Sequence, residues 1–170
     1  MVTWILMLMT ALQADAPWRD TYLETARAID RVAHASPIYD GEDGAARSAA
    51  TLVAIAFMES HFKPDAVAED GAPTYCLGQV DPRGLMATAE QLRADVDLCV
   101  NAMAQRARES VRVCALRGRA PLERLGQYTG GGGGCDRGLE AARRRGKLAD
   151  WLVRRWPVRW VEAGGLRVRP

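Results

Sequence analysis

The segment from Ala45 to Phe62 constrains the fold more than any other part of the sequence. It is rich in alanine, and as a helix it carries apolar side chains around most of its circumference. A helix that is apolar on nearly every side is stable only where other elements cover it. Pro64 then ends the segment, because proline cannot continue a helix. The sequence therefore predicts a helix at the centre of a helical bundle.

Helical periodicity also marks most of the remaining chain. Further helices are expected over Trp18–Ala33, from the cap residue Thr88 to about Leu116, over Leu122–Tyr128 and from about Leu139 to Trp156. Residues 63–82 carry repeated Pro and Gly, which predicts an irregular loop of a length typical of functional loops. The tail after Val158 alternates apolar and charged residues around Ala163-Gly-Gly165, which favours a small C-terminal hairpin.

A chain of 170 residues is long enough for one domain with a buried core. Abundant alanine and a low aromatic content of 6% favour close-packed helices over a β-sandwich. We therefore expect an all-α fold. It would consist of a single globular helical domain over residues 17–170, preceded by a separate N-terminal segment, residues 1–16.

The N-terminal segment has several features of an export signal. Residues 2–12 form an apolar run of suitable length, and Ala14-Asp15-Ala16 resembles a signal-peptidase site. A positively charged start is missing, however, and the run is too short for a secure membrane span. The segment predicts export to the periplasm, the cell wall or the medium. Two alternatives stay open, namely a hydrophobic first helix of the domain and an uncleaved anchor that holds the protein at a membrane.

The four cysteines are widely spaced and form no Cys-x-x-Cys pair. Neither histidine adds a zinc-like spacing to them. In an exported protein an even number of cysteines suits two disulfides, for which three pairings are open. The pairing that closes the shortest loops is Cys76–Cys99 with Cys114–Cys135. Four reduced thiols in the core are the alternative.

Glu59 is the most informative polar residue of the central helix. Its neighbours Ile55, Ala56, Phe57 and Met58 are all apolar. Apolar surroundings disfavour the charged carboxylate and so raise its pKa. A carboxylic acid that is still protonated near neutral pH can donate its proton to a glycosidic oxygen. Taken alone, a solvent-facing glutamate at a helix end is the simpler interpretation.

Three short motifs give Glu59 a context. At 56–66 a helix ends in Glu59-Ser60 and is followed by an aromatic residue, a Pro and an Ala. Gly71-Ala72 and then Cys76-Leu77-Gly78-Gln79 form a glycine-bearing turn that ends in Gln. The third motif is Leu125-Gly-Gln-Tyr128-Thr129-Gly130. In this order and spacing, the region 52–134 resembles the lytic transglycosylase family of the lysozyme-like superfamily.

The resemblance implies a mostly helical lysozyme-like fold with a sugar-binding cleft and a single catalytic glutamate, Glu59. It also implies that Ser60, Gln79, Tyr128 and Thr129 hold the substrate or the catalytic carboxyl. No metal or organic cofactor is implied. The sequence departs from the family pattern at Cys76 and Gly78, where Gly and Met are usual, and at Thr129, where Asn is usual.

The expected activity is cleavage of the β-1,4 bond between N-acetylmuramic acid and N-acetylglucosamine in peptidoglycan. A transglycosylase needs one carboxylate, because a hydroxyl of the substrate replaces water. A hydrolysing muramidase needs a second carboxylate, and Asp70 beside Gly71 is the best candidate. It is otherwise a solvated loop residue. A catalytically inactive peptidoglycan-binding module is the alternative from another class of function.

Charge is unevenly distributed along the chain. Residues 1–111 have 9 basic and 16 acidic residues, whereas residues 112–170 have 14 basic and 5 acidic ones. The Arg- and Trp-rich region 143–160 suits an anionic surface of a wall or membrane. The alternative is a helix with its Trp on the core and its Arg in water. The expected partner is peptidoglycan and not nucleic acid, although a basic nucleic-acid binder is a third hypothesis for the tail.

Overall fold

The structure, a computed structural model of the whole chain, describes residues 1–130 and 134–158. In order along the chain, the helices are α1 (Val2–Leu12), η1 (Arg19–Thr21), α2 (Tyr22–Ala35), α3 (Gly44–Ser60), α4 (Ala89–Ala94), α5 (Val96–Leu116), η2 (Pro121–Glu123), α6 (Gly126–Thr129) and α7 (Leu139–Arg155). Extended pairing in the described residues is limited to two isolated antiparallel bridges, Val67 with Tyr75 and Tyr75 with Val80. The expectation of a mostly helical single domain is confirmed.

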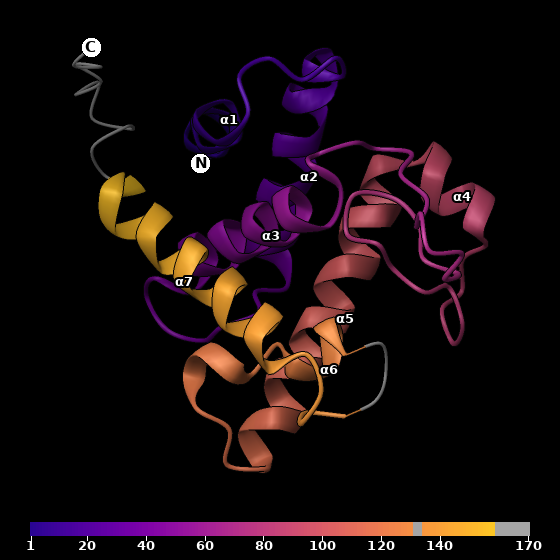
Figure 1. Cartoon of the computed structure of the whole chain (residues 1–170). Coiled ribbons are helices and arrows are strands. Elements are labelled where there is room, and N and C mark those ends of the chain that lie inside the picture. The colour runs from indigo at the N-terminus through magenta and orange to yellow at the C-terminus, as the bar shows by residue number, and fades with distance from the viewer. Residues whose placement is uncertain (131–133, 159–170) are drawn as a thin grey trace.

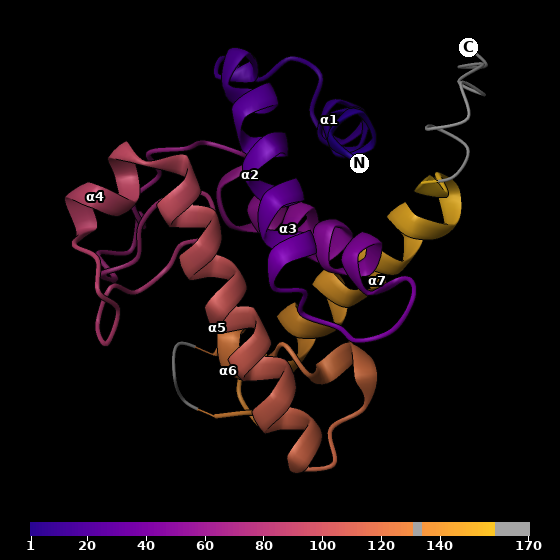
Figure 2. The same ribbon diagram turned by 180° about the vertical axis from the view of Figure 1, so that it is seen from behind.

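The helix α3 lies at the centre of the molecule (Figure 1). Residues 48–56 are buried without interruption, and α1, α2 and α7 pack around them. This confirms the prediction of a central helix that is covered on nearly every side. The long helix α5 packs on α2 and also contacts α3 (Figure 2).

The N-terminal helix α1 belongs to this core. Trp4, Ile5, Leu8 and Met9 are fully buried, and the helix packs on α2 and α3. The indole Nε1 of Trp4 donates a hydrogen bond to the carbonyl of Trp156. Here the segment is therefore a first helix of the domain, one of the alternatives left open above, and its removal after Ala16 stays a prediction. Among the described residues, no helix is both long and apolar enough to cross a membrane.

The prediction of a single helix from Thr88 to about Leu116 is wrong in one respect, because the helix is interrupted at Asp95. Asp95 has extended backbone angles, and its carboxylate accepts a hydrogen bond from the amide of Leu98. An aspartate in this position satisfies the first amides of a new helix better than it continues an old one. Thr88 caps α4 as expected, in a reciprocal arrangement with Gln91.

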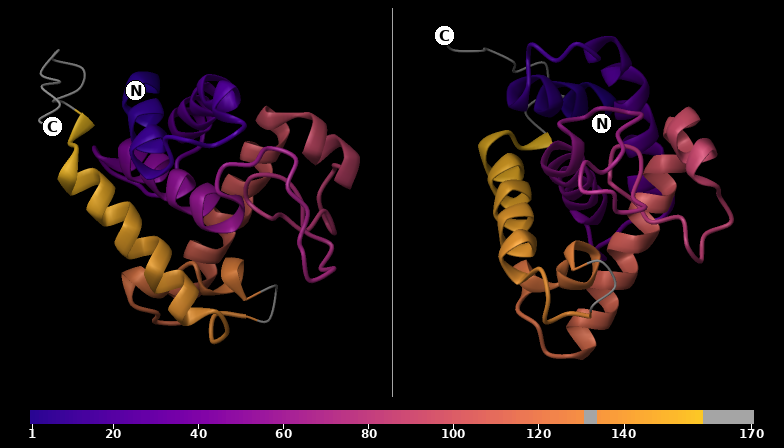
Figure 3. Two further views of the ribbon diagram at one scale, coloured as in Figure 1. Left: turned by 45° about the horizontal axis from the view of Figure 1, so that its top comes forward. Right: turned by 45° about the vertical axis from the view of Figure 1, so that its right-hand side comes forward.

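The other expected helices differ mainly at their ends. The helix expected to begin at Trp18 begins at Tyr22, after the single turn of η1. The one expected over Leu122–Tyr128 is divided into η2 and α6. The expected C-terminal hairpin and the centre of the five-glycine run lie outside the described residues. Figure 3 shows the arrangement that positions the site: α3 lies between α7 on one side and the irregular segment 61–88 on the other.

Candidate active site

The backbone after α3 turns sharply, and this turn places Glu59 at an edge of the core. His61 and Phe62 have φ values of 53° and 62°, in the left-handed region that side-chain-bearing residues seldom adopt. The amide of Phe62 donates to the carbonyl of Ala56, and the indole of Trp18 donates to the carbonyl of His61. Because Phe62 is fully buried, the surrounding packing holds this strained turn in place.

Glu59 forms an ion pair with Arg145 of α7. The Arg145 Nη2 to Glu59 Oε1 distance is 2.7 Å, and the two side chains are only 9% and 18% exposed. Arg145 also donates through Nη1 to the carbonyl of Ala141 in its own helix. No hydrogen bond within the described residues occupies the second oxygen, Oε2. The arginine therefore fixes the carboxyl through one oxygen and leaves the other for a ligand.

Burial raises the pKa of Glu59 above its ordinary value of 4.5, although Arg145 acts in the opposite direction. Desolvation outweighs the arginine because the carboxyl lies against the apolar end of α3. Tyr128 responds to the same environment. Its pKa is raised well above 10.0 by burial and by the nearby negative charge of Glu59. The site therefore combines a carboxyl and a phenol that both have raised pKa values.

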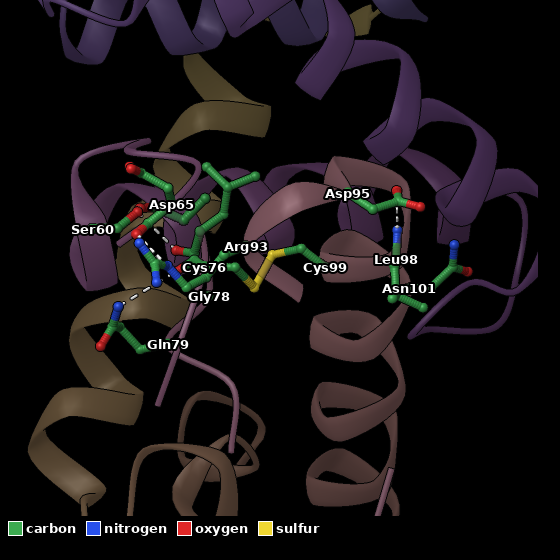
Figure 4. The surroundings of a disulfide bond; sticks show 12 residues. Ser60, Asp65, Cys76, Gly78, Gln79, Arg93, Asp95, Leu98, Cys99 and Asn101 are labelled. Carbon is green, nitrogen blue, oxygen red and sulfur yellow. Dashed lines mark hydrogen bonds between the residues drawn. A yellow bond between two sulfur atoms is a disulfide. The ribbon is translucent and has the colours of Figure 1, made fainter. Parts of the chain in front are cut away.

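The irregular segment 61–88 forms the second wall of the site, and a few specific contacts hold it. Cys76 is bonded to Cys99 of α5 by a disulfide (Figure 4). The hydroxyl of Ser60 donates to the carbonyl of Leu77 at 2.9 Å. The hydroxyl of Tyr128 donates to the carbonyl of Gly78 at 2.6 Å. The turn 76–79 is thus tied to α5, to the end of α3 and to α6.

The turn at Gly78 lies close to side chains of two other helices. A Cβ atom at this position would lie 2.6 Å from Sδ of Met103 and 2.7 Å from the hydroxyl of Tyr128. A side chain at this position would therefore force Met103 or Tyr128 to move.

Two neighbouring pockets form a groove along this wall. The first has a volume of about 490 Å³ and is lined by Glu59, Ser60, His61, Lys63, Ala66, Val67, Ala68, Glu69, Asp70, Ala72, Thr74 and Gln79. The second has a volume of about 390 Å³ and is lined by Ala72, Pro73, Thr74, Gln79, Val80, Asp81, Arg83, Arg106, Glu109, Gln127 and Tyr128. They share Ala72, Thr74 and Gln79, so the two pockets adjoin at these three residues.

The structure brings most of the expected site residues together. Ser60 and Gln79 line the pocket of Glu59, and Tyr128 lines the adjoining one. The hydroxyl of Ser60 donates hydrogen bonds to backbone carbonyls. The side-chain oxygen Oε1 of Gln79 accepts a hydrogen bond from the hydroxyl of Thr74 at 3.0 Å. Through these contacts, Ser60 and Gln79 stabilise the turn 76–79.

Thr129 and Asp70 take other positions. Thr129 lines neither pocket, and its hydroxyl donates to the carbonyl of Gly138 at 2.8 Å, which ties α6 to the start of α7. Asp70 lines the pocket of Glu59 and is exposed. Its Oδ1 accepts a hydrogen bond from the amide of Ala72 at 3.0 Å. This contact stabilises the turn, as aspartates in loops commonly do.

All four cysteines are paired as the shortest-loop arrangement predicts. Cys76 is joined to Cys99, and Cys114 is joined to Cys135. The second bridge connects the end of α5 to the segment before α7. Only the first bridge lies in the wall of the site.

Arg145 is the site residue that the sequence analysis missed, because it was grouped with the charged run 143–147. The helical repeat of α7 distinguishes Arg145 from the other charged residues of this run. Ala142, Arg145, Ala149 and Leu152 recur at helical intervals, and all four are buried. A single arginine within an otherwise apolar stripe indicates a buried partner charge.

The other described arginines of the Arg- and Trp-rich region are exposed on α7, and Arg159 and Trp160 lie outside the described residues. Trp151 is 46% exposed and contacts the ring of Trp156 edge-on at 5.1 Å. Arg155 lies over Trp156. The interpretation with every Trp on the core is therefore wrong for Trp151.

Comparison with models of protein families, with curated proteins and with solved structures finds no match for this chain. The geometry of the site therefore carries the functional argument.

Proposed function

We propose that this protein cleaves the β-1,4 bond between N-acetylmuramic acid and N-acetylglucosamine in peptidoglycan, as a lytic transglycosylase with Glu59 as its catalytic acid. One observation carries the proposal. Glu59 is a largely buried carboxyl of raised pKa, held through one oxygen by Arg145, at the side of an open groove. These are the properties of a general acid that protonates a leaving oxygen.

The proposed reaction uses the same carboxyl twice. Protonated Glu59 donates its proton to the glycosidic oxygen as the bond to C1 of the muramic acid breaks. The resulting carboxylate then accepts the proton of the C6 hydroxyl of the same sugar, whose oxygen attacks C1. The product ends in 1,6-anhydro-muramic acid, no water is consumed, and Glu59 is protonated again.

The two pockets suit a glycan strand. A polymer lying over Gln79 would place neighbouring sugars on either side of the shared residues Ala72, Thr74 and Gln79.

A hydrolysing muramidase is the second candidate, and Asp70 favours it. This exposed carboxylate lines the same pocket as Glu59, and its Oδ2 forms no hydrogen bond within the described residues. In that reaction Asp70 would activate a water molecule on the opposite side of the sugar. Export is part of either proposal, and the two disulfides support it, because such bonds persist in oxidising compartments.

The deciding experiment is mass spectrometry of purified peptidoglycan after incubation with the wild type and with Glu59→Gln. We expect products ending in 1,6-anhydro-muramic acid with the wild type and a loss of rate of about 10²–10⁴-fold in the variant. Glu140→Gln is the matched control, because Glu140 is an exposed glutamate at the start of α7.

Each other outcome has a defined meaning. Reducing-end products that depend on Glu59 would favour the hydrolase, and Asp70→Asn would be tested next. Intact glycan with both proteins, on walls that a control lysozyme digests, would exclude the enzyme. Sugar binding that Glu59→Gln leaves unchanged would then support the inactive binding module.

A further inference from the structure

A third pocket in the described part of the molecule has no role in the proposed reaction. Its volume is about 740 Å³, and it shares no lining residue with the two pockets of the groove. It is lined by residues of the connection between α2 and α3, of α3, α5 and α7, and of the segment that follows α5. Figure 2 shows how these segments are arranged. We call it the basic pocket, after its four arginines, Arg47, Arg108, Arg112 and Arg124.

These arginines come from three parts of the chain and converge on one space. Arg47 belongs to α3, Arg108 and Arg112 to α5, and Arg124 follows η2. Within the described residues, none of the four forms an ion pair with a carboxylate. Arg108 and Arg124 each donate one hydrogen bond to a backbone carbonyl, which orients them and leaves further N–H groups available.

Carboxylates do not neutralise this charge. The acidic lining residues are Asp40, which is exposed, and Asp150, whose ion-pair partner is Arg154 of the next turn. The pocket of Glu59 has the opposite character, because Glu59, Glu69 and Asp70 line it against the single cation Lys63. An anionic ligand would therefore prefer the basic pocket to the groove.

Hydrogen bonds and a ring contact hold the lining residues Ile38 and Tyr39 in place. The hydroxyl of Ser48, which is fully buried, accepts hydrogen bonds from the amides of Ile38 and Tyr39 and donates to the carbonyl of Gly44. The phenol of Tyr39 is held between Thr51, at 3.4 Å from hydroxyl to hydroxyl, and the guanidinium of Arg47, at 4.7 Å from the ring centroid. A site built this way needs little rearrangement on binding.

We propose that the basic pocket is a second ligand site, which binds a phosphate-bearing ligand through Arg47, Arg112 and their neighbouring arginines. Planar guanidinium groups pair with phosphate oxygens in bidentate fashion, and several around one space suit a group with three or more acceptors. The apolar walls from Ile38, Val111 and Val153 would cover the uncharged part of the ligand. The site does not depend on the chemistry of Glu59.

Phosphate could reach this site from two sources. One is a phosphodiester polymer of the cell wall and the other is a small phosphate ester. The test titrates each probe into the full-length Glu59→Gln variant with both disulfides intact. Binding is measured by calorimetry and by the NMR shifts of backbone amides. The probes are a poly(glycerol phosphate) chain, glycerol 3-phosphate, and glutarate as a dicarboxylate control.

We expect both phosphate probes to shift amides around Tyr39 and Arg112, and glutarate to bind at least about tenfold more weakly. The double substitution Arg47→Gln/Arg112→Gln should weaken phosphate binding about tenfold or more, because each arginine contributes a charge-assisted hydrogen bond. Arg144→Gln/Arg155→Gln, which removes two exposed charges from α7, should change affinity less than about twofold. Tighter binding per phosphate of the polymer would identify the wall polymer, and equal binding would identify the small ester.

The proposal fails if neither phosphate probe binds, if glutarate binds as tightly, or if the α7 double variant loses as much affinity as the pocket variant. Arg47 and Arg112 are both exposed, so the pocket variant should fold like the wild type. If its thermal unfolding midpoint nevertheless falls, each single substitution is titrated instead. The peptidoglycan assay of Glu59 is unaffected by any of these results.

Discussion

Glu59 lies between two regions that are stabilised in different ways, the helical wall formed by α3 with α7 and the irregular wall formed by segment 61–88. On one side, α3 and α7 pack along buried apolar faces. Within the described residues, the ion pair between Glu59 and Arg145 is the one buried charged contact between these two helices. On the other side, segment 61–88 has almost no regular structure. It is held by the disulfide of Cys76, by the hydroxyls of Ser60 and Tyr128, and by the close fit of Gly78.

This difference determines how each wall should respond to substitution. Apolar packing spreads its contribution over many contacts, so the helical wall is sensitive chiefly where a charge is buried in it. The irregular wall depends on a few contacts, and the loss of any one should change the position of Gln79. The first wall therefore controls protonation of Glu59, and the second controls the shape of the groove.

The largest effect is expected at the buried charge. Arg145→Met keeps the volume of the side-chain stem and leaves Glu59 without its partner, which costs about 3–5 kcal/mol at neutral pH. Because Arg145 lowers the pKa of Glu59, its loss should raise that pKa further. Activity that requires protonated Glu59 should then persist to higher pH than in the wild type. Denaturant unfolding and a pH–rate profile measure the two effects.

The pH dependence of this stability loss has a definite sign. A carboxyl whose pKa is raised by folding binds more protons in the folded state, so it lowers stability as the pH rises from the ordinary value of 4.5 through the raised value. The cost of Arg145→Met should therefore be small below pH 4.5 and full at neutral pH. Arg144→Met, at an exposed neighbouring position, is the control and should cost less than about 0.5 kcal/mol. An unshifted pH–rate profile for Arg145→Met would contradict the assigned role.

The disulfides test the irregular wall, because they close loops of nearly equal length. Sequence separation is 23 residues for Cys76–Cys99 and 21 for Cys114–Cys135. Replacing either pair by alanine should therefore cost a similar stability, about 3 kcal/mol. Only the loss of Cys76–Cys99 should also reduce activity below the unfolding temperature, because only this bridge anchors the turn before Gln79. Equal activity of the two variants, measured at one temperature well below both transitions, would contradict the comparison.

The smallest of these effects is expected at Gly78. Gly78→Ala inserts a methyl group against Met103 and the hydroxyl of Tyr128, which should cost about 1–3 kcal/mol of stability. Tyr128→Phe removes one of these two obstacles, so the double variant should lose less than the two single losses together. The unfolding free energies of the wild type, the two single variants and the double variant form a double-mutant cycle. Strict additivity would mean that Gly78 and Tyr128 do not share this close contact.

Much of the fold could be predicted from the sequence. The central helix, the long loop after it and the cap at Thr88 depend on local patterns of apolar, Pro, Gly and capping residues, and all three are observed. The break at Asp95 was missed because the apolar stripe continues across it, so periodicity gives no sign that the helix is interrupted. Glu59 was singled out because its neighbours in the chain are apolar and because the three short motifs resemble a known family, and its burial is observed.

What only the tertiary structure decided is the set of contacts between distant residues. Arg145 lies 86 positions from Glu59 and reaches it only because α3 and α7 pack together. Gly78 is tightly enclosed only because Tyr128 and Met103, from α6 and α5, converge on it. The sequence by itself determined most of the helices, since these follow from interactions within a few turns. The ion-pair partner of Glu59 and the basic pocket depend on packing, which brings together charged residues that are far apart in the sequence.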